Sequence, residues 1–292
     1  MTVHVLSAAA PAKINLTLEV TGRRDDGYHT LSTILQTLSL SDEVTVRLAG
    51  EAPGVLVSGP FAEGTPADAS NLAWRAAAAL AELTNRSCDG LGISIQKQIP
   101  PAGGLGGGAS DAATTLRLLQ PVWGASDGQL LKAASAVGSD EAALVLGGRV
   151  HATGRGDVVR VLPDGPKRAV VLFAVDIGLV GKTGRLFRAL TEHELDSGEV
   201  TEAALLDPGR LWTSAGVFNS FEMVAFDVFP GLAELRDDLK RRVGDAIRLA
   251  GAGPTLFWMG SPDACDDIIR RASGAGCKII PAETAESLWK PF

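Results

Sequence analysis

The strongest chemical signal in the sequence is a glycine-rich segment, residues 103–108, in which every position except Leu105 is glycine. Glycine lets the backbone adopt positive φ angles and approach a ligand without obstruction by a Cβ atom. An alternating apolar segment precedes this loop and an alanine-rich segment follows it, which predicts the order strand, loop, helix. A helix N-terminus directs free N–H groups and positive charge at a ligand. The segment therefore predicts a polyphosphate site, with a flexible loop that binds nothing as the alternative.

Two other phosphate-binding motifs match the sequence weakly. Residues 104–109 fit the relaxed dinucleotide fingerprint, but that fold needs a second strand ending in an acidic residue about twenty residues on, where a helix from Ser126 is predicted instead. Gly181-Lys182-Thr183 resembles the end of a P-loop, although Asp176 stands where the motif requires glycine. A carboxylate at that position would repel phosphates, so both alternatives are disfavoured.

Composition and charge restrict the partners. The 292 residues include 27 Lys and Arg against 34 Asp and Glu, a net charge of −7, without a dense basic cluster, which argues against nucleic acid. No uninterrupted apolar stretch reaches the length of about eighteen residues expected of a membrane span, so a soluble protein without a membrane partner is predicted. The three cysteines lack metal or redox spacing, which is typical of a reducing compartment, and we expect a cytoplasmic protein.

The first half of the chain combines strand and helix patterns. Apolar residues alternate in two stretches of the first fifty residues, which predicts half-buried strands joined by the polar, glycine-bounded segment 22–29. Ser70-Asn71 offers the N-cap of an alanine-rich helix over residues 72–83. Further helices are expected over residues 126–137 and after Asp140.

A cluster of turn residues, Pro163 to Pro166, separates this half from the rest of the chain. Beyond it come an apolar strand over residues 169–175, helical stretches to about Arg242, and a final strand, turn, strand, helix, strand series. The mixture predicts antiparallel strands with helices on one face. We therefore expect two domains, residues 1–163 and residues 164–292.

Four motifs, in order along the chain, resemble the GHMP kinase superfamily. Residues 101–113 are similar to its signature P-x-x-x-G-L-G-G-G-S-S-x-A-A, whose loop wraps the phosphates of ATP. Three further segments match in the expected order: Pro11-Ala12-Lys13-Ile14-Asn15-Leu16, Gly138-Ser139-Asp140 and Gly251-Ala252-Gly253-Pro254-Thr255. Two more segments resemble one branch of the superfamily, the diphosphocytidyl-methylerythritol kinases: Asp26-Gly27-Tyr28-His29, and Asn219-Ser220-Phe221-Glu222 followed by Phe229-Pro230-Gly231-Leu232.

The resemblance implies both a fold and a reaction. The fold is α+β, a two-domain GHMP kinase architecture with an N-terminal β-α-β domain carrying the glycine-rich phosphate loop and a ferredoxin-like C-terminal domain. The reaction is the ATP- and Mg²⁺-dependent phosphorylation of the 2-hydroxyl of diphosphocytidyl-methylerythritol in the non-mevalonate isoprenoid pathway, by a monomer or weak homodimer. The alternatives are a GHMP kinase for homoserine, mevalonate or a sugar, and a catalytically silent nucleotide-binding relative.

Lys13 and Asp140 match the catalytic pair of the superfamily. A carboxylate can orient the acceptor hydroxyl and accept its proton late in a loose transition state, while an ammonium stabilises the developing charge. The alternatives are a helix cap for Asp140 and a solvated strand residue for Lys13. The retention of both residues argues against a silent relative.

The remaining site residues are carried over from the same resemblance. Tyr28 is expected to stack on the cytosine ring and His29 to hydrogen-bond to it, with a surface turn as the alternative. Asn15 and Thr183 are expected to contact the substrate, and Phe187 lies nearby as either a contact or a core residue. The expected ATP-binding residues are Asn71, Lys97, Pro101, Gly103, Gly104, Leu105, Gly106, Gly107, Gly108, Ala109 and Ser110. The alternative role of Asn71 is a helix cap, and that of Lys97 is a solvated strand residue. Ser110 is also the expected metal contact, and its alternative role is a helix cap.

The sequence departs from the superfamily pattern near the phosphates. Ala109 replaces the first serine of the signature, and Ala250 and Ala252 replace serines that commonly flank the late glycines. Glu141 stands where valine is usual and adds a second carboxylate beside Asp140, either to assist a metal or to face solvent. These departures are expected to affect the efficiency of phosphoryl transfer more than the kind of reaction.

Overall fold

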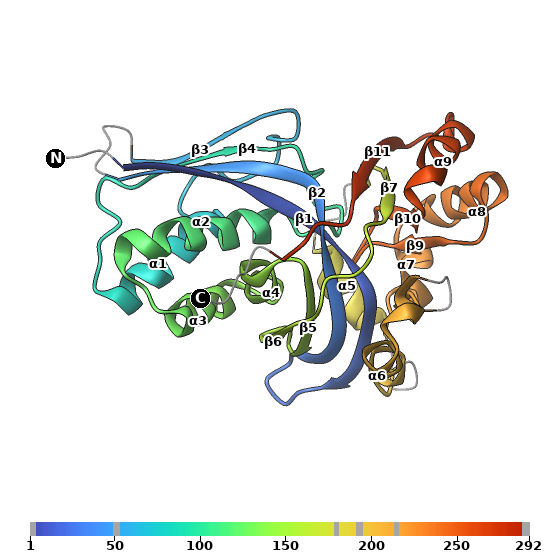
Figure 1. Cartoon of the computed structure of the whole chain (residues 1–292), viewed down its shortest axis with the longest axis horizontal. Helices are drawn as coiled ribbons and strands as arrows, with labels where there is room; N and C mark the ends of the chain where they lie inside the picture. The colour runs from blue at the N-terminus through green and yellow to red at the C-terminus, as the bar shows by residue number, and fades with distance from the viewer. Residues whose placement is uncertain (1–3, 49–52, 178–180, 191–194, 213–215, 288–292) are drawn as a thin grey trace.

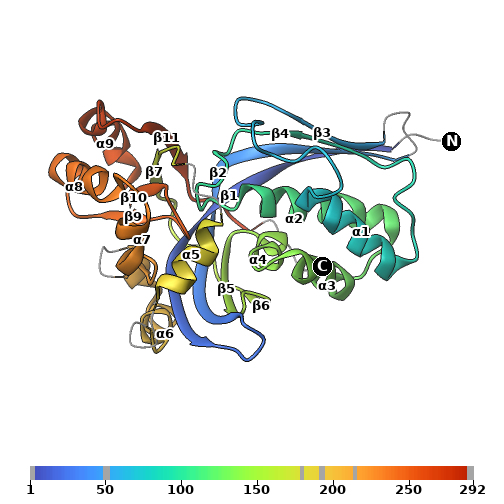
Figure 2. The same ribbon diagram turned by 180° about the vertical axis from the view of Figure 1, so that it is seen from behind.

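Two β-sheets meet in the middle of the molecule, and each has a group of helices beside it (Figure 1). This computed structural model describes residues 4–48, 53–177, 181–190, 195–212 and 216–287. The view from behind shows the same arrangement, with α1 to α4 grouped against the first sheet and α7 to α9 on the far side of the second (Figure 2).

The first sheet is built on a long antiparallel hairpin, as the alternating pattern predicts. Its strands are β1 (His4–Arg23) and β2 (His29–Leu48). One end of β2 pairs with β4 and the other with β5, so the order is β3-β4-β2-β1-β8, with β5 and β6 extending from β2. The other strands are β3 (Gly54–Ser58), β4 (Gly92–Gln96), β5 (Arg149–Gly154), β6 (Val158–Val161) and β8 (Phe218–Asn219).

Four helices cover this sheet, and their capping residues explain where they begin. The Asn71 side chain accepts a hydrogen bond from the N–H of Ala73, and Ser126 and Gln129 form a reciprocal capping box. Both predicted N-termini are therefore confirmed. The helices are α1 (Leu72–Thr84), α2 (Gly107–Trp123), α3 (Asp127–Val137) and α4 (Glu141–Leu146).

The second sheet has the ferredoxin-like order that the resemblance implies. Its strands are β7 (Ala169–Ala174), β9 (Ile247–Leu249), β10 (Leu256–Gly260) and β11 (Lys278–Glu283), arranged β11-β7-β10-β9 with every neighbouring pair antiparallel. The helices are α5 (Lys182–Ala189), α6 (Glu199–Leu206), α7 (Glu222–Val228), α8 (Leu232–Val243) and α9 (Cys265–Ala272), with short 3-10 turns at Pro208–Trp212 and Pro262–Ala264.

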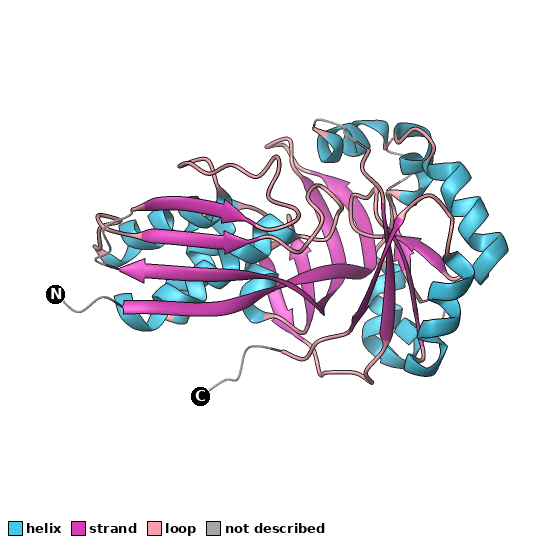
Figure 3. Cartoon of the chain, turned by 90° about the horizontal axis from the view of Figure 1, so that it is seen from above, coloured by secondary structure: helices cyan, strands magenta, loops and turns pink. Residues whose placement is uncertain are grey.

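Alternation along β7 buries both faces of this second sheet. Val171 and Phe173 pack with the helices, whereas Val170 and Leu172 share a core with Ile14 and other residues of the β1–β2 hairpin. Figure 3 shows the two sheets in contact from above. β8 also adds a strand of the second half to the first sheet, so the division at residues 163 and 164 stays a prediction. Within the described residues, no helix is both long and apolar enough to cross a membrane.

Candidate active site

The predicted site residues gather around one cavity of about 1110 Å³. The glycine loop, β1, the tip of the β1–β2 hairpin, the start of α4 and the start of α5 all contribute to its wall. Every residue assigned a binding or catalytic role from the sequence lines this cavity except Ser110. Segments far apart in the sequence are thus brought together where the two halves meet.

The glycine loop runs along β1 and leads directly into α2. Gly106, the N-cap of α2, has φ 71°, and none of the described side chains caps this helix. A Cβ atom on Gly106 would lie 2.9 Å from Lys13 Cγ, and the Lys13 N–H donates to the carbonyl of Leu105 at 2.9 Å. Only glycine allows this close approach. The first N–H groups of α2 are left to bind an anion from the cavity.

The first turn of α2 separates Ala109 from Ser110. Consecutive helical residues point about 100° apart. Ala109 accordingly lines the cavity, whereas Ser110 is 1% exposed and its Oγ has no hydrogen-bond partner among the described atoms. The alternative role predicted for Ser110, a helix cap, is wrong, because α2 has Gly106 at its N-cap and no side-chain capping hydrogen bond. The residue of this pair that faces the cavity is therefore the one that lacks a hydroxyl.

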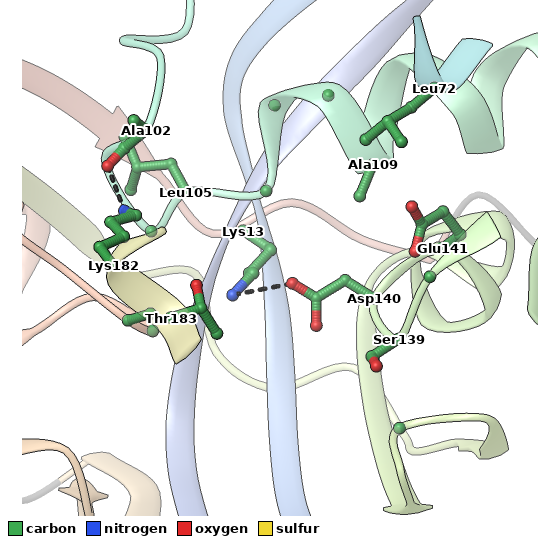
Figure 4. Close-up of a pocket in the computed structure, with 18 of the residues that line it drawn as sticks. Lys13, Leu72, Ala102, Leu105, Ala109, Ser139, Asp140, Glu141, Lys182 and Thr183 are labelled. Carbon is green, nitrogen blue, oxygen red and sulfur yellow. Dashed lines mark hydrogen bonds and ion pairs between the residues drawn. The ribbon is translucent and has the colours of Figure 1, made fainter. Parts of the chain in front are cut away.

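Lys13 and Asp140 both line the cavity and form an ion pair there (Figure 4). Lys13 Nζ lies 3.2 Å from Asp140 Oδ2 and donates to Asn15 Oδ1 at 2.8 Å. Asn15 in turn donates to Thr33 Oγ1 at 2.8 Å. Lys13 is almost fully buried, while the Asp140 side chain is 37% exposed to the cavity side. The ammonium is fixed by the chain, and the carboxylate remains accessible to a substrate.

The structure answers the alternative interpretations of this pair. Asp140 occupies the N-cap position of α4 but makes no side-chain capping hydrogen bond. Lys13 is buried and paired rather than solvated. The pairing of β1 with β2 is irregular next to both site residues of β1, Lys13 and Asn15. The register shifts lie between Pro11 and Lys13 and between Asn15 and Thr17. Bulges of this kind commonly re-aim side chains next to active sites.

A second buried ion cluster lies beneath the start of α2, and the sequence did not predict it. Lys97 Nζ bonds to Asp42 and, at 2.6 Å, to Asp111 Oδ2. Burial lowers the pKa of Lys97, but the charges of Asp111 and Asp42 outweigh it and leave that pKa raised. Burial and the nearby Asp42 raise the pKa of Asp111 to about 7 despite the ammonium. Lys97 is thus not a solvated strand residue.

Both polar atoms of the Asn71 side chain form hydrogen bonds within the fold. Its Oδ1 caps α1, and its Nδ2 donates to the carbonyl of Pro66 at 2.7 Å. It also lines the cavity. The cap is confirmed, and the position near an adenine ring stays a prediction.

Aromatic rings form the other end of the cavity, at the tip of the hairpin. Tyr28 is 52% exposed, and the Arg155 guanidinium lies 5.4 Å from its ring centroid. His29 stacks on Phe187 with centroids 4.4 Å apart and an interplanar angle of 15°. Burial and the charge of Arg23 lower the pKa of His29, so the ring is neutral at pH 7 with one donor and one acceptor. This end offers flat surfaces and a hydrogen-bonding ring.

The late glycine turn, residues 250–254, packs directly on the glycine loop. A Cβ on Gly104 would lie 2.0 Å from the carbonyl oxygen of Ala250, and one on Gly251 would lie 2.7 Å from that of Gly104. Asn219 Nδ2 holds the turn by donating to the carbonyls of Leu249 and Gly251 at 3.0 and 2.8 Å. The motif that begins at Asn219 therefore supports the turn.

Lys182 is a cavity residue that sequence reasoning missed. It begins α5, next to Thr183. Its ammonium donates to the carbonyl of Ala102, as Figure 4 shows, and to that of Gly253. Burial and the neighbouring charge of Lys13 lower its pKa to about 8. Its only signal in the sequence was the tripeptide Gly181-Lys182-Thr183, the weak match to the end of a P-loop. Residues 178–180, just before this tripeptide, lie outside the described residues.

Glu141 is buried at the start of α4 rather than directed to solvent. It is 3% exposed, and its carboxylate lies against Gly138, where a Cβ would approach to 2.5 Å. Burial, followed by the charge of Asp140, raises its pKa to about 7. The chain therefore keeps a second acidic group at the cavity wall that is only partly ionised at neutral pH.

We expect Glu141→Gln to stabilise the protein at pH 8 by about 2–3 kcal/mol and to leave its stability at pH 4 almost unchanged. The folded-state pKa of Glu141 lies above its ordinary value of 4.5, so its contribution to stability is full below about pH 4.5 and is lost as the pH rises through 7. Denaturant unfolding at both pH values measures the effect. The exposed Glu82→Gln is the control, and parallel pH profiles for wild type and Glu141→Gln would contradict the expectation.

Comparisons with known proteins show the family to which this chain belongs. Residues 71–148 match the GHMP kinases N terminal domain. The chain is 37% identical over 258 residues to the 4-diphosphocytidyl-2-C-methyl-D-erythritol kinase of Geobacillus thermodenitrificans, covering 86% of this chain and 87% of that one. The corresponding kinase of Saccharopolyspora erythraea is 36% identical over 290 residues, covering 94% and 90%. This chain belongs to the 4-diphosphocytidyl-2-C-methyl-D-erythritol kinase family.

Solved structures place the family in the GHMP fold. A crystal structure of 4-(cytidine 5'-diphospho)-2C-methyl-D-erythritol kinase matches 96% of this chain and all of its own with a TM-score of 0.74 at 30% identity. Homoserine kinase from Cytophaga hutchinsonii matches with a TM-score of 0.72 at 16% identity, which shows the fold alone. The predicted fold class is confirmed. The dinucleotide alternative is wrong, because this kinase has a largely antiparallel first sheet and α2 is followed by α3.

Proposed function

We propose that this chain transfers the γ-phosphoryl group of ATP to the 2-hydroxyl of 4-diphosphocytidyl-2-C-methyl-D-erythritol. Membership of the kinase family supports the substrate and the reaction. The observation that carries the proposal is the Lys13–Asp140 pair, which faces the N-terminus of α2 within a cavity that ends in the rings of Tyr28 and His29. One cavity thus combines a phosphate end, a transfer point and a base end.

The transfer itself requires positioning more than covalent chemistry. The acceptor oxygen forms a bond to the γ-phosphorus while the bond from that phosphorus to the β–γ bridging oxygen breaks, and ADP leaves. The hydroxyl proton passes to the Asp140 carboxylate, whose accessible face suits this role. The buried Lys13 ammonium and the free N–H groups of α2 stabilise the negative charge on the phosphoryl oxygens.

The cavity wall fits a magnesium ion bound with ATP. Mg²⁺ takes oxygen ligands, and the carboxylates of Asp140 and Glu141 both line the cavity. Ser110 supplies a buried hydroxyl without a partner among the described residues, but it does not line the cavity, so the two carboxylates are the better candidates. When bound, Mg²⁺ would neutralise charge on the phosphates and orient them. The described part of the chain contains no grouping of three or more metal-binding side chains.

The base end of the cavity suits a cytosine ring. Tyr28 offers an exposed aromatic face, and neutral His29 offers a donor and an acceptor to the polar edge of a pyrimidine. Phe187 positions His29 by stacking against it, and Phe221 packs edge-on against Phe187 with centroids 4.9 Å apart. We expect ring stacking to dominate affinity and the imidazole to dominate selectivity.

Tyr28→Ala is expected to raise KM for the cytidyl substrate about 10- to 100-fold, because stacking of a base on an aromatic ring contributes about 1–3 kcal/mol. The value of KM for ATP should change less than about twofold, since Tyr28 lies at the other end of the cavity. Steady-state kinetics with each substrate varied measures both constants. Tyr28→Phe retains the ring and is the matched control. An unchanged KM in Tyr28→Ala would exclude stacking on this residue.

The experiment that tests the proposed function compares acceptors. Purified protein is incubated with ATP, Mg²⁺ and, in separate reactions, the cytidyl substrate, mevalonate, homoserine and galactose, and ADP release is followed. Selective turnover of the cytidyl substrate supports the proposal. Turnover of another alcohol would keep the fold and reassign the substrate. ATP binding without turnover of any acceptor would favour the silent relative.

A further inference from the structure

Lys182 connects two segments of the active site that belong to different halves of the chain. Its ammonium donates to the carbonyl of Ala102, at the start of the glycine loop, and to that of Gly253, in the late glycine turn. Figure 4 shows its side chain extending from α5 to the loop beside Leu105. A single cation therefore bridges both glycine segments.

The surroundings of Lys182 are unusual for an ordinary surface lysine. Its side chain is partly buried next to the positive charge of Lys13, and both effects oppose an ammonium. Ala102 also has φ 53°, a left-handed conformation that non-glycine residues rarely adopt. The two carbonyls compensate for the lost water, and the bond to Ala102 holds that backbone in its left-handed conformation.

Among the described residues, few other hydrogen bonds join the two glycine segments. They touch closely at Gly104 and Gly251, but the backbone bond recorded between them, from Thr255 N–H to the Gly103 carbonyl, is long at 3.3 Å. The late turn is otherwise held from the second half by Asn219. Contact without strong bonding would let the phosphate loop move relative to the turn.

We propose that Lys182 is a positioning residue of the phosphate site, which holds the glycine loop against the late glycine turn. Because Thr183 follows it on α5 and lines the same cavity, the link also joins the nucleotide end to the acceptor end. Its kinetic consequences rest on the proposed function, whereas its effect on the unliganded loop does not. Lys182 acts through Ala102 and Gly253 and need not touch either substrate.

The first test measures amide hydrogen exchange in the unliganded full chain. Lys182→Met should accelerate exchange of the Gly253 and Thr255 amides about tenfold, because two hydrogen bonds to a charged donor are lost. Arg185→Met is the matched control, since Arg185 lies on the same helix and does not line the cavity. Lys182→Arg keeps the charge and the donors and should remain within about threefold of wild type.

Two results would overturn the proposal. One is unchanged exchange in Lys182→Met; the other is equal acceleration in Lys182→Met and Arg185→Met. Thermal unfolding of each variant is recorded first. A Lys182→Met chain that did not fold would also contradict the proposal, because a link between two loops should leave the rest of the fold intact.

The second test separates this role from a general structural one. The dissociation constant for ATP, measured by calorimetry without acceptor, should rise about tenfold in Lys182→Met and recover most of that loss in Lys182→Arg. Where turnover is measurable, KM for ATP should change more than kcat. If the cytidyl substrate is not turned over, the exchange and binding results still decide the role of Lys182. A kcat loss with unchanged ATP affinity would assign Lys182 to catalysis and overturn the positioning role.

Discussion

Asp140→Asn is expected to lower kcat about 10³-fold and to leave the dissociation constant for ATP within about twofold of wild type. The substitution preserves the shape of the side chain but removes the group that accepts the hydroxyl proton. Asp140 makes no capping hydrogen bond to α4, so the fold should not depend on its charge. Single-turnover kinetics and calorimetric titration with ATP measure the two quantities separately.

Asp89→Asn is the matched control for this variant, because Asp89 is an exposed carboxylate that does not line the cavity, and its substitution should leave kcat unchanged. The thermal unfolding temperatures of both variants should stay close to that of wild type. Turnover of Asp140→Asn at more than about a tenth of the wild-type rate would remove Asp140 from the chemical step.

Lys13→Met is expected to lower kcat about 10²- to 10³-fold and to weaken ATP binding by about tenfold. The Lys13 side chain packs against Gly106 through its methylene carbons, and its ammonium contacts both Asp140 and Asn15. Its loss therefore removes positive charge at the transfer point and leaves the carboxylate without its counter-ion. Lys13→Met should therefore destabilise both the bound ground state and the transition state, whereas Asp140→Asn should destabilise only the transition state. The same two measurements distinguish the variants.

Lys132→Met, on the exposed side of α3, controls for the loss of a lysine. Lys13→Arg offers a sharper comparison: the slot beside Gly106 leaves little room for a guanidinium, so this charge-preserving variant should also be impaired. Wild-type activity in Lys13→Arg together with loss in Lys13→Met would mean that charge alone matters. Wild-type activity in Lys13→Met would contradict the assigned role.

Local sequence signals predicted the parts of this site that lie within one segment. The run of glycines before α2 predicted the loop, and Asn71 and Ser126 marked helix starts that the structure has at those residues. Alternation predicted the β1–β2 hairpin, although β1 is buried on both faces from Ala10 to Val20. The pairing of Lys13 with Asp140 came from ordered family motifs, since their separation along the chain carries no local signal.

Contacts between distant segments could not be predicted in the same way. The bonds of Lys97 to Asp42 and Asp111 depend on how β2, β4 and α2 pack, and the bridge made by Lys182 depends on how the two halves meet. The orientation of Ser110 required the rotation of α2 about its axis, which a glycine-rich start leaves undetermined from sequence. The need for glycine at Gly251 in the late turn became clear only from the structure, because a Cβ atom there would collide with the backbone of the glycine loop.

The most direct test of the central claim follows the phosphate itself. ATP labelled at the γ-phosphate is incubated with Mg²⁺, 4-diphosphocytidyl-2-C-methyl-D-erythritol and either wild type or Asp140→Asn, and the acceptor is separated and analysed for label and position. The account predicts label on the 2-hydroxyl of the methylerythritol moiety with wild type and almost none with Asp140→Asn. Unlabelled acceptor with folded, ATP-binding wild type, or equal labelling by both proteins, would contradict it.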